Sequence, residues 1–468
     1  MDDNEPEEVL GFDWDEEGGV YAVVGRRGKR LADGEVTSTP DGLRQLLATL
    51  DEYRDPATGE QPVVVVEMTR RPVLRALMDH GVTVHGINAG TLHGLRAGRK
   101  KTKSDLNDAT WLARRYRTDP TDFRPISAYS ADAYGITLLS RQEKDSAVRA
   151  QRAAGRVRSL LAEFYPAPLG AWKTSDLFDD PVAATVLLAA PTPEEGRALT
   201  LPQITELVRS TGKPSYIADE AEKAYKAMQR EFLTYDEQTV VQYGKSLTVH
   251  LEGLLGNIHE HAALDKQLVT ACKKHPFMPL VKGAVGSGPK VIARLIGEIG
   301  DERTTLQEDG VRLLRRFPTA DGFAAFAGVS PLDQSSHSHQ EHVRRDVKGN
   351  RLHRALWDWA EIARQHSAGP MHFYWSRREA GDHHSTAIRK VAFKLAIRLH
   401  RCLTREEPWV EAKAWPSAPP MQEARQKRDE VKKIIAKRNR PGNKRPTPSP
   451  ARTTDADSSG EPSSTDAA

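Results

Sequence analysis

Residues 62–67, with the sequence Pro-Val-Val-Val-Val-Glu, decide the fold of the N-terminal region. Four consecutive valines after a proline are typical of a short strand that is buried on both faces, as in the middle of a parallel sheet. A carboxylate such as Glu67 is costly to bury at the end of such a strand unless a partner compensates its charge. The stretch therefore predicts an α/β domain and a compensated acidic site within it.

The residues around this strand alternate as they do in α/β domains. Apolar runs at 9–13 and 20–24, separated by the turn signal Glu17-Gly18-Gly19, and a third run near 30–36 predict an antiparallel set of strands. The other expected elements are helices at about 41–53, 72–80 and 104–116 and a strand at 82–87. The predicted order over residues 1–120 is therefore β, β, β, α, β, α, β, α.

Length and composition limit what the rest of the chain can be. Its 468 residues are too many for one compact core, so we expect several domains. Only two cysteines occur, which excludes a disulfide framework and a multi-cysteine zinc site and favours a reducing compartment. No stretch stays apolar for the roughly 18 residues of a membrane span, and the acidic N-terminus has no leader pattern. These features predict a cytoplasmic protein with no membrane partner.

The middle of the chain, residues 121–275, is expected to be helical. Apolar residues alternate at spacings of four and three from Leu247 to Ile258, which is the seam of a coiled coil. Prolines interrupt the pattern near 166–215, so we expect two long helices joined by an irregular insertion, in a coiled coil that is antiparallel or between subunits. Residues 276–415 are expected to form a mainly helical domain, and residues 416–468 a disordered basic tail rich in Pro and Ser.

The net charge is only +4, but the charges are unevenly distributed. Residues 1–17 contain nine acids and no base, whereas basic residues dominate 91–117, 386–405 and 421–445. Three separate basic stretches favour a polyanionic partner, although each stretch alone is equally compatible with a solvated helix face.

Four acidic residues of the N-terminal domain are candidate metal ligands. Asp13 ends the first predicted strand, and Glu67 ends the buried strand that we expect beside it. Asp105 and Asp108 share one face of a predicted helix. Carboxylate oxygens suit Mg²⁺, and two such ions about 4 Å apart could stabilise both the attacking and the leaving oxygen of phosphoryl transfer.

Each of these acids also has a structural role open to it. Asp13 could begin a turn, Glu67 could pair with Arg70 or Arg71, and Asp105 could cap its helix. Such roles give no reason for all four acids to meet at adjacent strand ends, so we favour the metal site. The lysines just before the helix are expected to contact a nucleic-acid backbone there; they are Lys100, Lys101 and Lys103.

Several phrases of the sequence are distinctive when taken together. They are LGFD (10–13), VVVVEMT (63–69), GVTVHGINAGTLHGLRAGRKKTKSDLNDATWLA (81–113), GPKVIARLIGEIGD (288–301), FAAFAGVSPL (323–332) and VKGNRLHRALWDWA (347–360). In this combination the chain resembles the DEDD transposases of the insertion-sequence one-ten family, over roughly residues 9–120 and 276–405. The resemblance implies an RNase H-like, or RuvC-like, mixed-sheet domain with a catalytic tetrad, a coiled-coil dimerisation region and a C-terminal transposase domain. The implied tetrad is Asp13, Glu67, Asp105 and Asp108.

The resemblance also implies an activity and its partners. The protein would be a transposase or recombinase that excises and integrates its own insertion sequence with the help of Mg²⁺, as two ions. Its partners would be the element ends, the target DNA, a noncoding bridge RNA and further copies of the chain, as a dimer or tetramer. It would then be located in the cytoplasm, at the nucleoid. Composition alone does not indicate an RNA partner.

A segment of the C-terminal domain, from Gly328 to His339, is loop-like and rich in hydroxyl groups. In the resembling family a nucleophilic serine lies a few positions after the proline of a Gly-x-x-Pro phrase. This places the nucleophile at Ser336, with Ser335 as the second candidate. Serine attack on a phosphodiester would conserve the bond as a phosphoserine linkage, so that strands could be rejoined without ATP.

Other residues of the C-terminal domain are candidates for contacts with nucleic acid. The turn Gly286-Ser287-Gly288 before Lys290 resembles that of a helix-hairpin-helix unit, although an ordinary interhelical turn explains it as well. An amphipathic helix at 388–405 has a basic stripe beside its apolar stripe, made of Lys390, Lys394, Arg398, Arg401 and Arg405. The remaining candidates for phosphate contacts are Arg344, Arg345, Lys348, Lys390, Lys394 and Arg398.

Two other functions fit many of the same residues. A structure-selective nuclease of the Holliday-junction-resolving kind would share the carboxylates but would not need the serine. A non-catalytic nucleic-acid-binding protein would use the acids only to hold a helix to the sheet.

Overall fold

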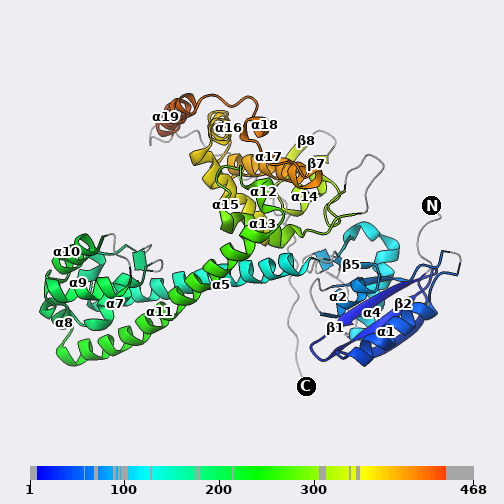
Figure 1. Cartoon of the computed structure of the whole chain (residues 1–468), viewed down its shortest axis with the longest axis horizontal. Helices are drawn as coiled ribbons and strands as arrows, with labels where there is room; N and C mark the ends of the chain where they lie inside the picture. The colour runs from blue at the N-terminus through cyan, green and yellow to red at the C-terminus, as the bar shows by residue number, and fades with distance from the viewer. Residues whose placement is uncertain are drawn as a thin grey trace, which may run out of the picture.

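The computed structural model describes residues 8–56, 58–67, 72–87, 91–92, 95, 104–126, 129–173, 176–177, 180–212, 216–304, 312–336, 339–343 and 348–438. An α/β domain at the N-terminus is followed by an arm of two long helices that carries a small helical bundle at its far end (Figure 1). A mainly helical domain surrounds the base of the arm. The predicted fold class is confirmed.

The N-terminal domain contains a mixed sheet of six strands in the order β3-β2-β1-β4-β5-β6. The strands are β1 (Val9–Trp14), β2 (Gly18–Val24), β3 (Arg30–Thr37), β4 (Val63–Val66), β5 (Val84–Ile87) and β6 (Phe123–Pro125). β1 pairs antiparallel with β2 and parallel with β4, which in turn pairs parallel with β5. The four valines are fully buried in the middle of the sheet, as predicted. β6, an antiparallel edge strand, was not predicted.

Helices cover both faces of this sheet. α1 (Pro40–Glu52) and α2 (Pro72–Asp79) pack on the face that contains the side chains of Leu10, Phe12, Val64 and Val66. α4 (Asp105–Thr118) packs on the other face, against Val9, Val63 and Val65. A Cβ atom at Gly11 would lie 1.9 Å from the carbonyl oxygen of Ala109, so only glycine lets α4 approach β1 this closely.

The arm consists of α5 (Ala131–Phe164) and α11 (Glu237–Lys274), which pack on each other within one chain. Ser146 near the base contacts His261 (3.2 Å), and Glu163 near the far end contacts Tyr243, so the two helices are antiparallel. The predicted seam from Leu247 to Ile258 is buried between them. Of the two predicted arrangements, the structure has the antiparallel one.

The prediction of an irregular insertion between these helices was wrong. The insertion contains η2 (Ala167–Gly170), α7 (Pro181–Ala189), α8 (Pro193–Ala198), α9 (Leu201–Ser210) and α10 (Ile217–Met228), with a hydrophobic core that it shares with the far end of the arm. Three of its prolines, Pro181, Pro193 and Pro202, lie in the first turn of a helix and do not break it. Pro181 and Pro193 are the first residues after the caps Asp180 and Thr192, where the N–H that proline lacks has no partner within the helix.

The C-terminal domain is built from short and long helices and one hairpin. Its elements are α12 (Met278–Val281), α13 (Pro289–Ile299), α14 (Ala320–Phe326), β7 (Leu332–Ser336), β8 (His339–Val343), α15 (Asn350–His366), α16 (Ala368–Glu379), α17 (His384–Arg405), α18 (Glu411–Ala414) and α19 (Met421–Arg438). Ile136 of α5 and Leu268 of α11 belong to the same hydrophobic core, so the base of the arm is part of this domain. No helix in the described part of the chain is long and apolar enough to span a membrane.

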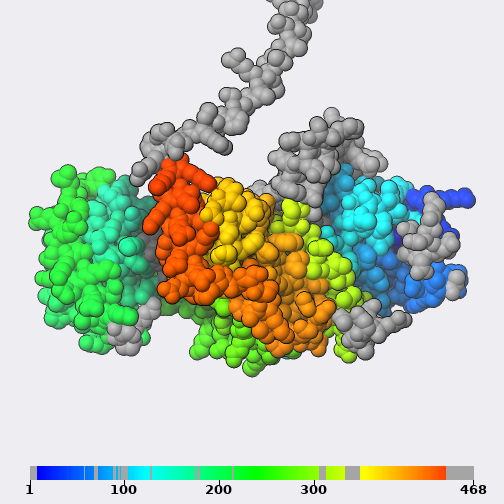
Figure 2. Space-filling view, turned by 90° about the horizontal axis from the view of Figure 1, so that it is seen from above, coloured from blue at the N-terminus to red at the C-terminus, as the bar shows by residue number. Residues whose placement is uncertain are grey.

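The prediction of a disordered tail from residue 416 was wrong as far as residue 438. α19 packs against α16 on the surface of the C-terminal domain (Figure 2), with Ala424 and Val431 buried in the core. Its composition is very polar, and apart from the half-buried Met421 and Ile435 only these two residues, seven positions apart, mark the buried face. Residues 439–468 lie outside the described residues.

Candidate active site at the edge of the N-terminal sheet

Asp13 and Glu67 lie side by side at one edge of the sheet. In the parallel pairing of β1 with β4, Phe12 is opposite Val66, so the residues that follow them are also neighbours. Side chains alternate between the two faces of a strand. Because Val9 and Val65 face α4, Asp13 and Glu67 belong to the same face, and both are half-buried.

α4 brings its first turn to the same edge of the sheet. Ala109 lies above Gly11, in the middle of β1. Farther along the helix, Arg114 donates a hydrogen bond from Nε to the carbonyl oxygen of Gly28, in the turn beside the start of β1 (2.8 Å). The helix therefore runs opposite to β1, and its N-terminal residues Asp105 and Asp108 lie toward the end of β1 that holds Asp13.

The structure contradicts two of the structural roles that the acids could have had. Ser104, not Asp105, caps α4, because its hydroxyl accepts the hydrogen bond from the N–H of Asn107 (3.3 Å). Asp13 does not begin a turn, since it is paired with Val20 in the ladder between β1 and β2. Two candidate partners of Glu67, Arg70 and Arg71, lie outside the described residues.

The four acids fit a hard cation by their chemistry, because all of them offer carboxylate oxygens. Within the described ranges, no three His, Cys, Asp or Glu side chains form a group that could hold a metal ion. The backbone thus brings the four positions to one edge, while the carboxylates are not gathered around one point. Like charges repel one another unless a cation lies between them, so their approach would depend on the ion itself.

The serine candidates lie in a strand, not in a loop as predicted. β7 and β8 form an antiparallel hairpin in which Ser335 is opposite Gln340 and Ser336 is opposite His339. Only two residues, 337 and 338, connect the strands, and they lie outside the described residues. A hairpin is recognised from a turn dipeptide such as Asn-Gly between strands of alternating apolar residues, and the polar strands LDQSS and HQEHV lack that pattern.

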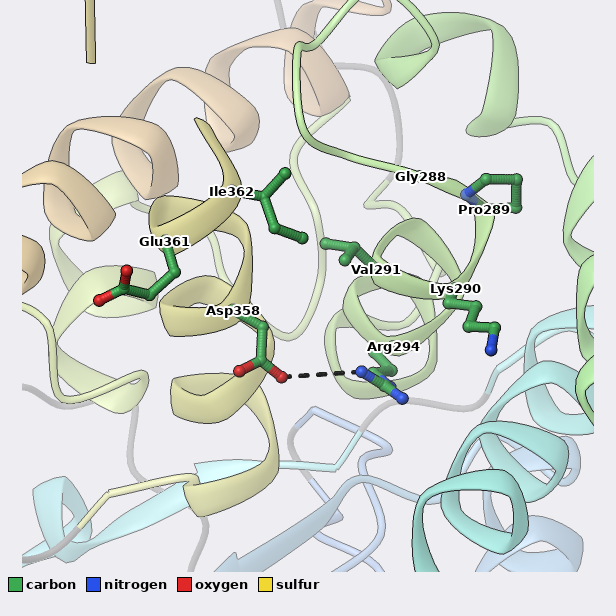
Figure 3. Close-up of a pocket in the computed structure, with 8 residues that line it drawn as sticks. All are labelled: Gly288, Pro289, Lys290, Val291, Arg294, Asp358, Glu361 and Ile362. Carbon is green, nitrogen blue, oxygen red and sulfur yellow. Dashed lines mark ion pairs between the residues drawn. The ribbon is translucent and has the colours of Figure 1, made fainter. Parts of the chain in front are cut away.

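The predicted glycine turn connects α12 to α13 and borders a pocket of about 460 Å³. Gly286 has φ of +82°, a conformation that favours glycine, and Gly288 is the N-cap of α13. Figure 3 shows that the pocket is lined by two cations and two carboxylates, with Arg294 paired to Asp358 (3.6 Å). Lys290 is also paired, with Asp265 of α11 (3.0 Å). These charges balance, so the pocket has no net attraction for a phosphate.

Three of the five cations in the predicted basic stripe of α17 have contacts within the chain, whereas Arg401 and Arg405 are exposed. Lys390 lies 2.8 Å from Asp382, the ammonium of Lys394 lies 4.7 Å from the centre of the Phe373 ring, and the guanidinium of Arg398 lies 4.0 Å from the Trp415 ring. Burial lowers the pKa of Lys394 and Arg398. These contacts give the three cations a role in packing, and their binding to phosphate stays a prediction.

The other predicted basic contacts are placed only in part. Lys348 precedes α15 and packs over Gly328, where a Cβ atom would lie 2.4 Å from the Cδ atom of the lysine. The rest lie outside the described residues; they are Lys100, Lys101, Lys103, Arg344 and Arg345.

One group of basic residues was missed by the sequence prediction. Arg149, Arg152 and Arg156 lie on one exposed face of α5. Their spacing of three and four residues was the available signal, but this stretch is less densely basic than the three that were singled out.

Comparison with known protein families defines the class of the protein. A family model whose description reads "Transposase", of the DEDD type, matches residues 10–166, which include the whole sheet and the four acids. A second, described as "Transposase IS116/IS110/IS902 family", matches residues 278–376, which include the hairpin with the two serines. The RNase H-like fold and these matches define a transposase, a DNA phosphoryl-transfer enzyme of the kind that uses a divalent metal.

Individual relatives identify the family. The chain is 32% identical over 417 residues to the mini-circle protein of IS117 from Streptomyces coelicolor. This match covers 88% of this chain and 97% of the relative. It is 27% identical over 303 residues to a 43.6 kDa protein of insertion element IS110 from the same organism (62% and 68%). It is 25% identical over 210 residues to the y4uE protein of Sinorhizobium fredii (42% and 55%). The chain therefore belongs to the IS110 family of transposases.

Proposed function

We propose that this transposase excises and integrates its own insertion sequence by attack of a serine hydroxyl on DNA phosphodiesters. The observation that supports the proposal most is the placement of four acids at one edge and on one face of the N-terminal sheet. The proposed ligands of Mg²⁺ are Asp13, Glu67, Asp105 and Asp108, and the proposed nucleophile is Ser336, with Ser335 as the alternative.

The four acids come from elements of different rigidity. Asp13 and Glu67 follow paired strands, so their backbone positions are fixed by the sheet. Asp105 and Asp108 lie in the first turn of α4, where the helix dipole favours a negative charge. Two Mg²⁺ ions bound there would stabilise charge on the attacking and leaving oxygens of the phosphodiester. The sheet would thus fix two ligands, and the helix would bring the other two.

The serine step conserves the energy of the DNA backbone. A new bond forms between the Oγ atom of Ser336 and phosphorus, the bond from phosphorus to a deoxyribose oxygen breaks, and the proton of the serine passes to the departing oxygen. Reversal of the same step with another DNA end rejoins a strand. The hairpin and the acids belong to different domains of the chain, so the site would be composite, either through domain movement or between subunits of a dimer or tetramer (Figure 1).

The proposal also includes a guide RNA, which rests only on the resemblance to the transposase family. A noncoding bridge RNA would select the element ends and the target by base pairing. Flanking noncoding segments of the element, able to fold with loops that match both the ends and the insertion site, would support it. Their absence from every genomic copy would contradict it.

A Holliday-junction-resolving type of nuclease remains the alternative activity, because it would use the same acids with water as the nucleophile. The two are distinguished on denaturing gels after incubation of the protein with element-end DNA and Mg²⁺. Serine catalysis predicts a covalent protein–DNA adduct and rejoined strands that are lost in Ser336→Ala. If Ser336→Ala and Ser335→Ala both retain full strand exchange, the serine proposal is wrong. Free-ended products without an adduct would favour the nuclease.

A further inference from the structure

Three arginines form a stripe along the outward face of α5, in the part of the arm between the C-terminal domain and the bundle. Arg149, Arg152 and Arg156 are spaced by three and four residues, so they lie on one face of the helix, and all are exposed. Arg149 contacts Glu260 of α11 (2.6 Å), an ion pair in which both side chains are about half exposed. Arg152 and Arg156 have no hydrogen-bond or ion-pair partner among the residues that the structure describes.

The stripe continues onto α15 at the base of the arm. Asp145, one turn before Arg149, lies 3.4 Å from Arg351 in the first turn of α15. Arg354 follows on α15 with 64% of its side chain exposed, and it contacts Asp358 (2.8 Å). α15 begins at residue 350, shortly after β8 ends at residue 343, so the basic surface starts near the serine hairpin in the chain. We call this surface the arginine track; it consists of Arg149, Arg152, Arg156, Arg351 and Arg354.

The ion pairs of the track can be exchanged for phosphate. Exposed ion pairs contribute little to stability, and arginine binds a phosphate with two parallel hydrogen bonds at least as well as it binds a carboxylate. At the base of the track, burial lowers the pKa of Lys144; the nearby charges of Arg294 and Arg354 lower it further, and those of Asp358 and Glu143 oppose them.

We propose that the arginine track binds the phosphate backbone of a DNA duplex that runs from the serine hairpin along the arm. Between Arg149 and Arg156 the helix rises by about 10 Å, which is the axial distance covered by about three phosphates of one DNA strand. DNA is favoured over RNA because it is the substrate of this family of enzymes. The inference rests on DNA binding by the transposase and does not depend on the serine mechanism.

The bundle at the end of the arm sets the limit of the track. Residues 167–236 contain eleven acids and seven bases, so this part of the molecule repels phosphate. DNA on the arm is therefore expected to end its contacts before the bundle. The bundle also offers exposed basic residues whose removal changes the net charge without touching the track, namely Arg209, Lys223 and Lys226.

The test is the salt dependence of DNA binding by the full chain. Binding to a fluorescent duplex of about 40 base pairs would be measured by anisotropy in EDTA, which removes catalysis, at several salt concentrations between about 50 and 200 mM. Each lost phosphate contact lowers the slope of log K against log salt by about 0.9. For Arg149→Gln/Arg152→Gln/Arg156→Gln we expect the slope to fall by about 2 to 3 and the affinity at about 100 mM salt to fall at least tenfold.

Two control variants separate the track from net charge. Arg158 is exposed on the same helix but about 200° around it from Arg156, so Arg158→Gln should leave the slope unchanged. Arg209→Gln/Lys223→Gln/Lys226→Gln removes three charges from the bundle and should also leave it unchanged. Thermal unfolding of each variant checks the fold, which exposed positions of this kind should not affect.

Three results would overturn the proposal. The first is a wild-type slope in the triple variant of α5. The second is an equal fall of the slope in the bundle control, which would show that the effect comes from net charge alone. The third is loss of binding to a stem-loop RNA with duplex DNA binding intact, which would assign the track to RNA. Because binding is measured in EDTA, where no strand is cleaved, failure of the catalytic proposal would be distinguishable from failure of this one.

Discussion

Two long helices of this transposase, α17 and α5, carry basic residues at helical spacing and use them in opposite ways. On α17 three of the five cations of the predicted stripe each have a contact inside the chain, with a carboxylate or an aromatic ring, and only the last two, Arg401 and Arg405, are exposed. On α5 two of three arginines have no partner in the described part of the chain, and the third has only an exposed one. Spacing and charge alone therefore cannot identify a nucleic-acid-binding face.

The difference is caused by what covers each helix. α17 lies under α16 and the segment around α18, which supply the rings of Phe373 and Trp415, and long basic side chains pack well over such rings. The three arginines of α5 are exposed, and no aromatic ring in the described part of the chain covers them. A basic stripe is open to a ligand only where the fold leaves it uncovered.

The largest effect is expected from removing the most deeply packed cation of α17. Arg398→Ala deletes a half-buried guanidinium that stacks on Trp415, so we expect the free energy of unfolding to fall by about 1 to 2 kcal/mol. Urea denaturation would measure this change. The salt dependence of DNA binding should stay at the wild-type value. Unchanged stability together with a lower salt slope would mean that α17, and not α5, is the DNA-binding helix.

The orientation of α5 depends on the carboxylate of Asp301, which binds the backbone at the start of the helix. Asp301 accepts a hydrogen bond from the backbone N–H of Ser130, the N-cap of α5 (2.9 Å), and lies 3.4 Å from His275. Burial would raise the pKa of Asp301, but the interaction with His275 and the hydrogen bonds from Ser130 lower it to about 2. Such a carboxylate stabilises the fold above its unfolded pKa of about 3.9, and this stabilisation is lost as the pH falls towards 2.

We therefore expect Asp301→Asn to lower the free energy of unfolding at neutral pH by about 1 to 2 kcal/mol, after allowance for screening by solvent. The difference from the wild-type protein should disappear as the folded-state pKa is approached from above. Denaturation curves at several pH values would measure it, with the exposed Asp15→Asn as the matched control. A difference that is the same at every pH would show that Asp301 has no charge-dependent role at the start of α5.

A smaller effect is expected at the first cation of the α17 stripe. The pKa of Asp382 is lowered by the hydrogen bond from Arg377. Burial partly opposes this shift, and the hydrogen bond from Lys390 adds to it. The pair of Lys390 and Asp382 should therefore contribute about 0.5 to 1 kcal/mol above the unfolded pKa of about 3.9 and less as the pH falls below it. A double-mutant cycle with Lys390→Gln and Asp382→Asn would measure this coupling. A coupling of zero would leave Lys390 available for a phosphate.

The smallest effect is expected from an acid within the arginine track. Asp145→Asn removes a negative charge between Arg149 and Arg351, so DNA should bind about twofold more tightly at low salt. The anisotropy titration used for the arginine variants would detect this change. Asp132→Asn, an exposed acid in the first turn of α5, is the matched control. Weaker binding by Asp145→Asn would mean that the DNA does not pass along this face.

The sequence predicts the N-terminal sheet well because its signals are local. The run of valines at 63–66 suits only a strand that is buried on both faces, and its end fixes Glu67 at the same edge as Asp13. β6 was missed because a strand of three residues shows no periodicity. Its partner β5 also lies far back in the sequence, before α4. Register and face could thus be predicted for the acids, but not the directions of their carboxylates.

Elsewhere the sequence was not sufficient, because packing decides between two possible roles of the same residue. A proline such as Pro181 either breaks a helix or begins one, and only the preceding cap Asp180 distinguishes them. The phosphate contact of Arg398 stays a prediction, but its stacking on Trp415, seventeen positions further along the chain, could not be predicted from the local sequence. Ser336 lies in a strand because of a partner segment that has no apolar pattern.

The central claim is that Asp13 and Glu67, from neighbouring strands, serve one metal-dependent reaction. Its most direct test is Mg²⁺-dependent cleavage of element-end DNA by Asp13→Asn and by Glu67→Gln, with Asp15→Asn as the matched control. We predict that each of the two variants loses at least about a hundredfold in cleavage rate, while folding, DNA binding in EDTA and the control remain at wild-type levels. Wild-type cleavage by either variant, with the same dependence on Mg²⁺, would contradict the account.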